Sequence, residues 1–173
     1  MPALTGLRPL RTLVVAPVLA LAILAAASTL APATGATAAS TSGSSHPAAS
    51  RQQKVLKAAD VALRQLGDRY RYGADGPRSF DCSGLMKYSY RKAGLKLPRT
   101  SSAQAKHAHR IRKKNLRRGD LMFFHDGGGV YHAAMFLKWK KGHAVMVHSP
   151  GSGERVRRDK PWTKSWFAAT VRR

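Results

Sequence analysis

The chain has 173 residues, enough for a single domain, and only one cysteine, which excludes an internal disulfide bond. Its 31 basic and 8 acidic residues give a formal net charge of +23. A charge of this size indicates an anionic partner or surface, such as nucleic acid, an anionic membrane or an anionic cell wall. No zinc-finger or RNP-like sequence accompanies it, so specific nucleic-acid recognition is not expected.

Residues 1–38 are predicted to be a secretion signal. Arg8 and Arg11 form a basic start, residues 13–27 are apolar, and residues 36–38 (Ala-Thr-Ala) have the small-x-small form of a signal peptidase site. The apolar run is shorter than the roughly 20 residues that a membrane-spanning helix needs. We therefore expect export, with a retained anchor as the alternative.

Residues 39–50 are rich in serine and alanine and are predicted to be a linker without fixed structure. The globular domain should then span residues 51–173, and it contains no internal repeat. Helical patterns come first in this domain and strand-like patterns come later. This order is typical of an α+β fold.

Apolar residues recur at helical spacing over residues 55–66 and again over residues 85–93, and a glycine ends each run. A third, weaker helix is expected to begin after a cap at Thr100 or Ser101 and to end near His109.

The strand signals begin with the short apolar run 121–124, which a glycine turn at 127–129 follows. Residues 130–139 and 144–148 are rich in strand formers, and residues 167–171 could add a final strand. Consecutive strands joined by short turns predict an antiparallel sheet.

Cys82 is the candidate nucleophile. It follows a turn-rich stretch, residues 73–77, and opens the second predicted helix. The positive end of a helix dipole favours thiolate over thiol, so this position suits a reactive cysteine. The alternative is a buried structural thiol, which free cysteines often are.

A cysteine nucleophile needs a base, usually histidine, whose ring a third group holds in place. Of seven histidines, His132 and His148 fall on predicted strands, and antiparallel pairing could bring them near each other and the cysteine. A hydrogen-bonded core histidine is the ordinary alternative for each. His107, His109 and His125 match no zinc-ligand spacing, so no metal or cofactor is expected.

Six sequence blocks in order resemble the NlpC/P60 family of cell-wall cysteine peptidases over about residues 52–171. The blocks are Tyr70-Arg71-Tyr72-Gly73, Phe80-Asp81-Cys82-Ser83-Gly84-Leu85, Leu97-Pro98-Arg99-Thr100-Ser101, Gly119-Asp120-Leu121-Met122-Phe123-Phe124, His132-Ala133-Ala134-Met135-Phe136-Leu137 and Val147-His148-Ser149-Pro150. One block alone would be a weak match, whereas six in order are specific. The departures from the family pattern, Arg69, Tyr72 and Ala74, concern the groove wall rather than the nucleophile.

The resemblance implies a papain-like α+β fold, with N-terminal helices packed on a small antiparallel sheet. It implies Cys82 as nucleophile, His132 as its imidazole partner and His148 as the residue that orients that ring. It also implies that Tyr70 helps to stabilise the oxyanion, although an ordinary core tyrosine is the alternative.

The residues on either side of the nucleophile are expected to bind substrate. In the family the residue at Asp81 helps to shape the substrate pocket, and the group at Ser83 contributes to recognition of the substrate's amine end. Each has a structural alternative, because Asp81 could simply cap the following helix and Ser83 could simply occupy its first turn.

The resemblance implies a secreted peptidoglycan endopeptidase that cuts stem peptides between D-γ-glutamyl and a diamino acid. An amidase or acyltransferase on the same scaffold is one alternative, and a non-catalytic cationic wall-binding protein is another. We expect a monomer that is extracellular and associated with the cell wall. Its basic surface should bind anionic wall polymers, and it should not contact the membrane once the signal is removed.

Overall fold

The computed structural model describes residues 47–173, and the predicted signal segment and most of the predicted linker lie outside them. Helix α1 spans Pro47–Leu63, so the expected linker boundary at residue 50 is wrong, because residues 47–50 are helical. Proline is well suited to a first helical position, where its missing N–H is not needed, and alanine is the strongest helix former. The composition that suggested a linker therefore also suits the start of a helix.

Helix α2 (Cys82–Lys92) and helix α3 (Ser101–His107) both begin at capping side chains. The carboxylate of Asp81 accepts the backbone N–H of Gly84 at 2.7 Å, and the hydroxyl of Thr100 accepts that of Ala103 at 3.2 Å. Helix α3 ends two residues earlier than expected because His109 already belongs to strand β3 (His109–Ile111).

Six antiparallel strands form one sheet in the order β3-β8-β4-β5-β6-β7. The predicted strands are present as β4 (Leu121–Asp126), β5 (Gly129–Lys140), β6 (His143–His148) and β8 (Trp166–Thr170). The edge strands β3 and β7 (Arg157–Asp159) were not predicted, because they are three residues long and mostly charged or polar. The fold is α+β, as expected.

Two short pieces complete the chain between these elements. Strands β1 (Arg69–Tyr70) and β2 (Ser79–Phe80) form a parallel pair just before α2, and a 3-10 turn, η1, covers Lys113–Asn115. None of the helices described in residues 47–173 combines the length and apolar character that crossing a bilayer requires.

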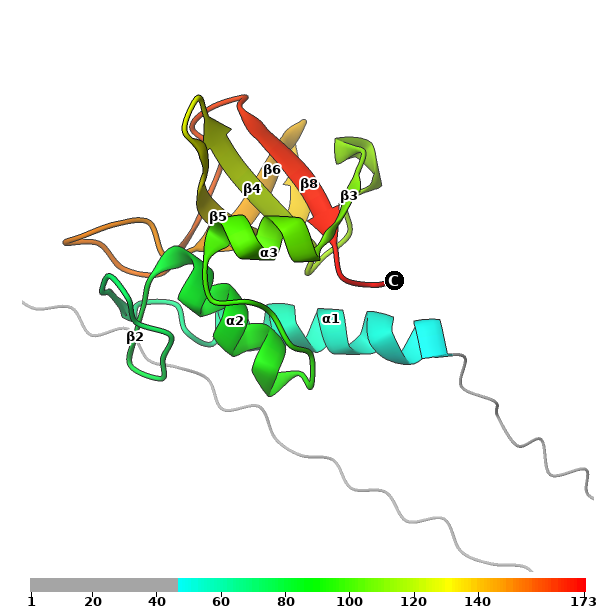
Figure 1. Ribbon diagram of the computed structural model, residues 1–173, viewed down its shortest axis with the longest axis horizontal. Coiled ribbons are helices and arrows are strands. Elements are labelled where there is room, and N and C mark those ends of the chain that lie inside the picture. Colours follow the sequence, from blue (N-terminus) through cyan, green and yellow to red (C-terminus); the bar gives the residue numbers. More distant parts are fainter. Residues whose placement is uncertain (1–46) are drawn as a thin grey trace, which may run out of the picture. The chain divides into compact units, whose positions relative to one another are not determined.

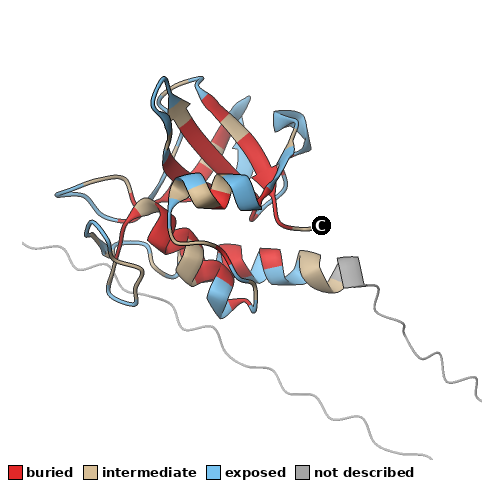
Figure 2. Ribbon diagram, in the orientation of Figure 1, coloured by how far each residue is buried: buried red, intermediate tan, exposed pale blue. Residues whose placement is uncertain are grey.

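The sheet is buried on both faces, as the red segments of its strands show in Figure 2. On β4, Leu121 and Phe123 join the cluster that faces the helices, whereas Met122 and Phe124 join a second cluster on the opposite face. Two-sided burial explains why four consecutive residues of this strand are apolar.

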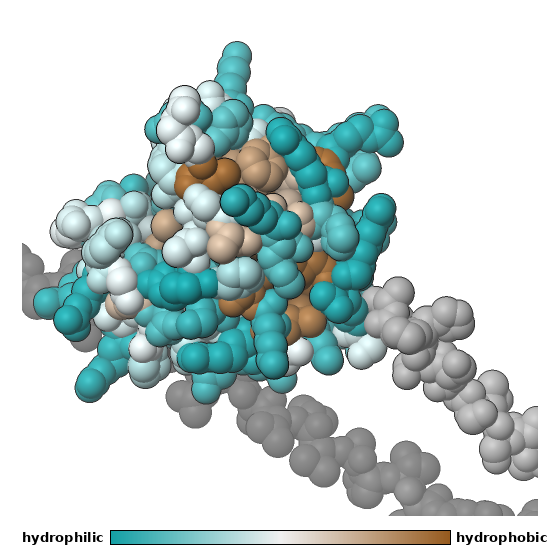
Figure 3. Space-filling model, in the orientation of Figure 1, coloured by the Kyte–Doolittle hydropathy of each residue, from teal (hydrophilic) through white to brown (hydrophobic). Residues whose placement is uncertain are grey.

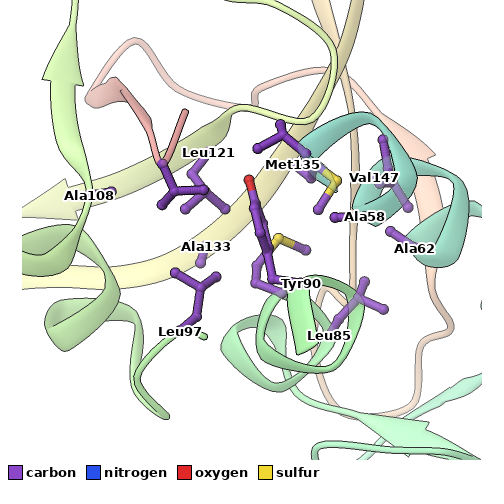
Figure 4. Packing of buried hydrophobic residues seen from close by; sticks show 14 of the residues in the cluster. Ala58, Ala62, Leu85, Tyr90, Leu97, Ala108, Leu121, Ala133, Met135 and Val147 are labelled. Carbon is purple, nitrogen blue, oxygen red and sulfur yellow. The ribbon is translucent and has the colours of Figure 1, made fainter. Parts of the chain in front are cut away.

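Helices α1 and α2 lie side by side against one face of the sheet (Figure 1). Tyr90 of α2 stands in the middle of the cluster between them and the sheet, surrounded by Leu85, Leu97, Leu121 and Met135 (Figure 4). Its hydroxyl donates to the carbonyl of Gly119, so the one polar atom of this buried ring is satisfied.

Two buried hydrogen bonds connect the start of α2 to the rest of the domain. The hydroxyl of Ser149, next to the end of β6, donates to the carbonyl of Phe80 at 2.8 Å. The side chain of Gln104, buried in α3, donates to the carbonyl of Ser83 at 2.8 Å. Because both bonds join segments far apart in sequence, the residues around Cys82 are held by tertiary contacts and not by the helix alone.

Candidate active site

Cys82 is the first residue of α2 and is largely buried, with its sulfur next to strand β5. The backbone N–H of Ala133 on β5 is near enough to the sulfur to lower the pKa of the thiol. Ala133 directly follows His132 on this strand.

Burial raises the pKa of the Cys82 thiol, and the negative charge of Asp81 adds to this effect. The hydrogen bonds from the N–H groups of Ala133 and Ser83 lower the pKa, but burial is the largest influence. The expectation that the helix N-terminus would favour thiolate is therefore wrong for the free protein. The resting site holds a protonated thiol.

His132 and His148 are in contact, as the antiparallel arrangement predicted. Strands β5 and β6 are neighbours in the sheet, and Nε2 of His132 lies 3.0 Å from Nδ1 of His148. Burial lowers the pKa of His132 to about 3 and that of His148 to about 4. Both rings are therefore neutral at physiological pH.

A cavity of about 410 Å³ opens in front of the cysteine. Four of the six predicted site residues line it, namely Tyr70, Asp81, Cys82 and Ser83, whereas His132 and His148 are not among the lining residues. Burial and the nearby Cys82 and Asp81 raise the pKa of Tyr70, so its hydroxyl keeps its proton and can donate it in a hydrogen bond.

A slightly larger cavity of about 440 Å³ lies elsewhere, near the C-terminus, and is lined by basic side chains such as Lys114, Arg117 and Arg173. It contains no nucleophile and no histidine. We place the candidate active site at the smaller cavity because the reactive groups are there.

Asp81 does cap α2, so the structural alternative for this residue is confirmed. Its two carboxylate oxygens also accept the Ser83 hydroxyl at 3.1 Å and the N–H of Gly73 at 3.0 Å. Burial would raise the pKa of Asp81, but the hydrogen bonds from Arg99, the Gly84 N–H and Ser83 together lower it. Asp81 is therefore a charged carboxylate that is held from several sides.

Arg99 is a cavity residue whose position the sequence did not reveal. It donates to both carboxylate oxygens of Asp81, with one contact at 3.0 Å, and it donates to the Ser83 hydroxyl at 3.1 Å. The paired donors of a guanidinium match a carboxylate in this two-point geometry. Arg99 thus fixes both predicted substrate-binding residues.

Trp162 covers the histidine pair and was also missed. It lies in the segment between β7 and β8, stacked on Phe124 at a ring distance of 4.2 Å. The ring centroid of Trp162 lies 5.1 Å from that of His132, in an edge-to-face arrangement, and 5.7 Å from that of His148. Trp162 is itself 53% exposed, whereas the two histidines that it contacts are buried.

The other histidines within residues 47–173 do not join the site. His107 and His109 are exposed, and His125 lies on β4 next to Phe167. Within residues 47–173 no three histidine, cysteine or acidic side chains are grouped closely enough to hold a metal ion.

The sequence model of the NlpC/P60 family matches residues 67–173, which is more than half of the chain. The chain belongs to the NlpC/P60 family.

Several curated proteins to which the chain is similar are named as endopeptidases, most of them as probable endopeptidases. The probable endopeptidase p60 of Listeria monocytogenes is 40% identical over 92 residues, which cover 53% of this chain and 18% of that protein. The bifunctional muramidase/DL-endopeptidase CwlT of Bacillus subtilis is 36% identical over 96 residues, which cover 53% of this chain and 28% of CwlT. This chain therefore spans less than a third of either relative.

The NlpC/P60 fold is also seen in solved structures. The structure of the peptidoglycan hydrolase RipB of Mycobacterium tuberculosis matches with a TM-score of 0.62 at 26% sequence identity, covering 74% of this chain and 69% of RipB. The match extends the likeness from sequence blocks to the arrangement of the helices and the sheet.

Proposed function

We propose that this NlpC/P60 chain is a secreted peptidoglycan hydrolase, a cysteine endopeptidase that cuts stem peptides between D-γ-glutamyl and a diamino acid. One observation carries the proposal. The only cysteine of the sequence lines a cavity of about 410 Å³ at the start of α2, and the same domain holds the paired rings of His132 and His148. The names of p60 and CwlT as endopeptidases and of RipB as a peptidoglycan hydrolase support the same class of reaction.

The proposed reaction starts from a neutral thiol and a neutral imidazole. Because Nε2 of His132 is engaged by His148, Nδ1 is the atom that would take the thiol proton. The thiolate attacks the stem carbonyl, and the protonated His132 then gives its proton to the leaving amine. Water hydrolyses the resulting thioester and restores the free cysteine.

The developing oxyanion would have two donors. The backbone N–H of Cys82 belongs to the first turn of α2, and Tyr70 lines the same cavity with a protonated hydroxyl. Donors that are already in place before the reaction need no reorganisation when negative charge develops.

Asp81, Ser83 and Arg99 form the proposed binding wall of the cavity. The carboxylate of Asp81 and the guanidinium of Arg99 place a negative and a positive charge side by side. The Ser83 hydroxyl is hydrogen-bonded to both groups. A stem fragment with a free amine and carboxylates offers complementary charges to this group.

The basic surface is proposed to bind anionic wall polymers. Hydrophilic side chains cover most of the face in Figure 3. Exposed basic residues cluster in three stretches, residues 110–118, 138–141 and 155–158. Since exposed charges are screened within about 3 Å at 1 M salt, we expect added salt to release the protein from purified walls. Retention that is independent of salt would contradict this part of the proposal.

The decisive experiment digests purified stem fragments with the protein and with Cys82→Ala, and the products are identified by mass spectrometry. Cleavage between the second and third stem residues by the unmodified protein alone supports the endopeptidase. Release of an intact stem from the sugar would indicate an amidase, and binding without a product from either form would indicate a non-catalytic wall-binding protein.

Export and oligomeric state have their own measurements. We propose that the signal is removed after residue 38, so protein recovered outside the cell should begin at Ala39 when its N-terminus is sequenced. The mature domain should sediment as a monomer. It should also be absent from the membrane fraction of the cells.

A further inference from the structure

One nitrogen of the buried histidine pair has no hydrogen-bond partner. Nδ1 of His148 is bonded to His132, but Nε2 of His148 is buried and unpaired among the described residues. The acidic group facing it is Asp159 on β7, whose Oδ2 lies 3.8 Å away. A buried polar atom without a partner is costly, so the approach of a carboxylate to this atom calls for an explanation.

The sheet places Asp159 there. Strand β7 runs antiparallel to β6, with Arg157 opposite His148 and Asp159 opposite Met146. The carboxylate is held in place by the side chain of Arg157 at 3.1 Å and the backbone N–H of Lys160 at 2.8 Å. Asp159 is therefore a fixed charge at the edge of the histidine pair rather than a mobile surface group.

The bond between the two rings requires one ring to donate and the other to accept. If His148 carries its proton on Nε2, its Nδ1 accepts from Nε2 of His132, and Nδ1 of His132 is left with a lone pair. If His148 instead carries its proton on Nδ1, it donates to His132, whose own proton must then sit on Nδ1. Only the first arrangement lets His132 take a proton from Cys82.

We propose that Asp159 is a positioning residue that holds the proton of His148 on Nε2 and so keeps Nδ1 of His132 free to act as the base. This inference rests on the proposed cysteine peptidase mechanism. A carboxylate facing Nε2 favours a proton on that atom, as the carboxylate does in other oriented histidine bases. The contact at 3.8 Å shortens when the pair takes up a proton, because catalytic hydrogen bonds tighten as charge develops.

The charges around His148 favour this role. Asp159 from β7 and Glu154 from the preceding turn stabilise the protonated form of His148, whereas the positive charge of Arg157 opposes it. The neutral ring of His132 contacts His148 from β5. An orienting histidine alone brings no negative charge to the imidazolium. Asp159 supplies a negative charge next to His148, on the side of that ring away from His132.

The test compares Asp159→Asn with Glu154→Gln. Both variants remove one negative charge that contacts Arg157, but only Asp159 faces Nε2 of His148. With a stem fragment as substrate, Asp159→Asn should lower kcat by roughly tenfold to hundredfold with little change in KM, a part of the 10² to 10⁴ that acid–base catalysis contributes. The acidic limb of its pH profile should move to lower pH, because the protonated pair loses a stabilising charge. Glu154→Gln removes the weaker of the two charges and leaves Nε2 facing Asp159, so it should lower kcat clearly less than Asp159→Asn does.

A second readout does not depend on hydrolysis. Nitrogen NMR of labelled histidines in the full chain at neutral pH should show His148 protonated on Nε2, and Asp159→Asn should lower the population of that tautomer. A proton on Nδ1 of His148 in the unmodified protein, or unchanged tautomers and kinetics in Asp159→Asn, would overturn the proposal. If no stem fragment is cut at all, the proposed function fails while the NMR result still decides the role of Asp159.

Discussion

Arg99 donates to both carboxylate oxygens of Asp81, the residue directly before Cys82. The contact joins the loop before α3 to the N-cap of α2, so one ion pair fixes both the start of the helix and a wall of the cavity. The hydroxyl of Ser83, which donates to Asp81, accepts a hydrogen bond from the same Arg99 guanidinium. The nucleophile is therefore framed by a rigid polar group on its substrate side.

The first prediction concerns this two-point contact. Arg99→Lys keeps the charge but replaces the planar fork with a single ammonium, so one oxygen of the buried Asp81 loses one of its hydrogen bonds. We expect a loss of about 1–3 kcal/mol in the free energy of unfolding, measured by urea denaturation, and a higher KM for stem fragments. Arg78→Lys, on an exposed turn residue, is the control. If both variants changed the free energy of unfolding and KM by the same amount, the structural role proposed for Arg99 would be wrong.

The second prediction concerns the hydroxyl of Tyr70. Tyr70→Phe removes one proposed oxyanion donor while leaving the ring, so kcat should fall by about 10² to 10³ with little change in stability. Tyr72→Phe is the matched control, because Tyr72 lines the same cavity but is 87% exposed. Steady-state kinetics on stem fragments separate the two variants. A comparable loss in both would indicate that the tyrosines shape the groove and that neither meets the oxyanion.

The third prediction concerns the glycine two residues after the nucleophile. A Cβ on Gly84 would lie 2.1 Å from the carbonyl oxygen of Ala74, so Gly84→Ala must push the turn before β2 away from α2. Overpacking of this kind costs about 1–3 kcal/mol, and the shift should also lower activity. Gly127→Ala, whose Cβ meets nothing within 4 Å, should change neither. Thermal unfolding of both variants makes the comparison.

The fourth prediction is a pH dependence of stability. The pKa values of His132 and His148 in the folded protein are about 3 and about 4, below the ordinary 6.5. As the pH falls below 6.5 the unfolded chain takes up these protons before the folded chain does, so folding stability should decrease from pH 6.5 to pH 4.

Replacement of the pair checks the cause. The double variant His132→Gln/His148→Gln should lose much of this slope in urea denaturation curves recorded across the same pH range. His143→Gln, an exposed histidine at the start of β6, is the control and should retain the slope. A slope that persists in the double variant would assign the pH dependence to other groups.

The sequence by itself determined the local elements and the family. Apolar periodicity located α1 and α2, the Asp81 cap and the Thr100 cap follow from residue type, and the apolar runs located β4, β5, β6 and β8. Helix caps and apolar periodicity depend on residues a few positions apart in the chain. They can therefore be recognised without knowing how the segment packs. Six ordered blocks were enough to identify the NlpC/P60 family before the fold was known.

Tertiary structure decided the features that depend on distant contacts. Strands β3 and β7 have little apolar character of their own and exist because β8 and β6 offer them hydrogen-bonding edges. The same pairing carries Asp159 to the unpaired nitrogen of His148. The thiol of Cys82 is the clearest case, because its place at a helix N-terminus predicts a lower pKa and its burial against β5 raises it instead. Removal of the sulfur from water is the largest influence on this pKa, and only the packed structure shows how far the sulfur is buried.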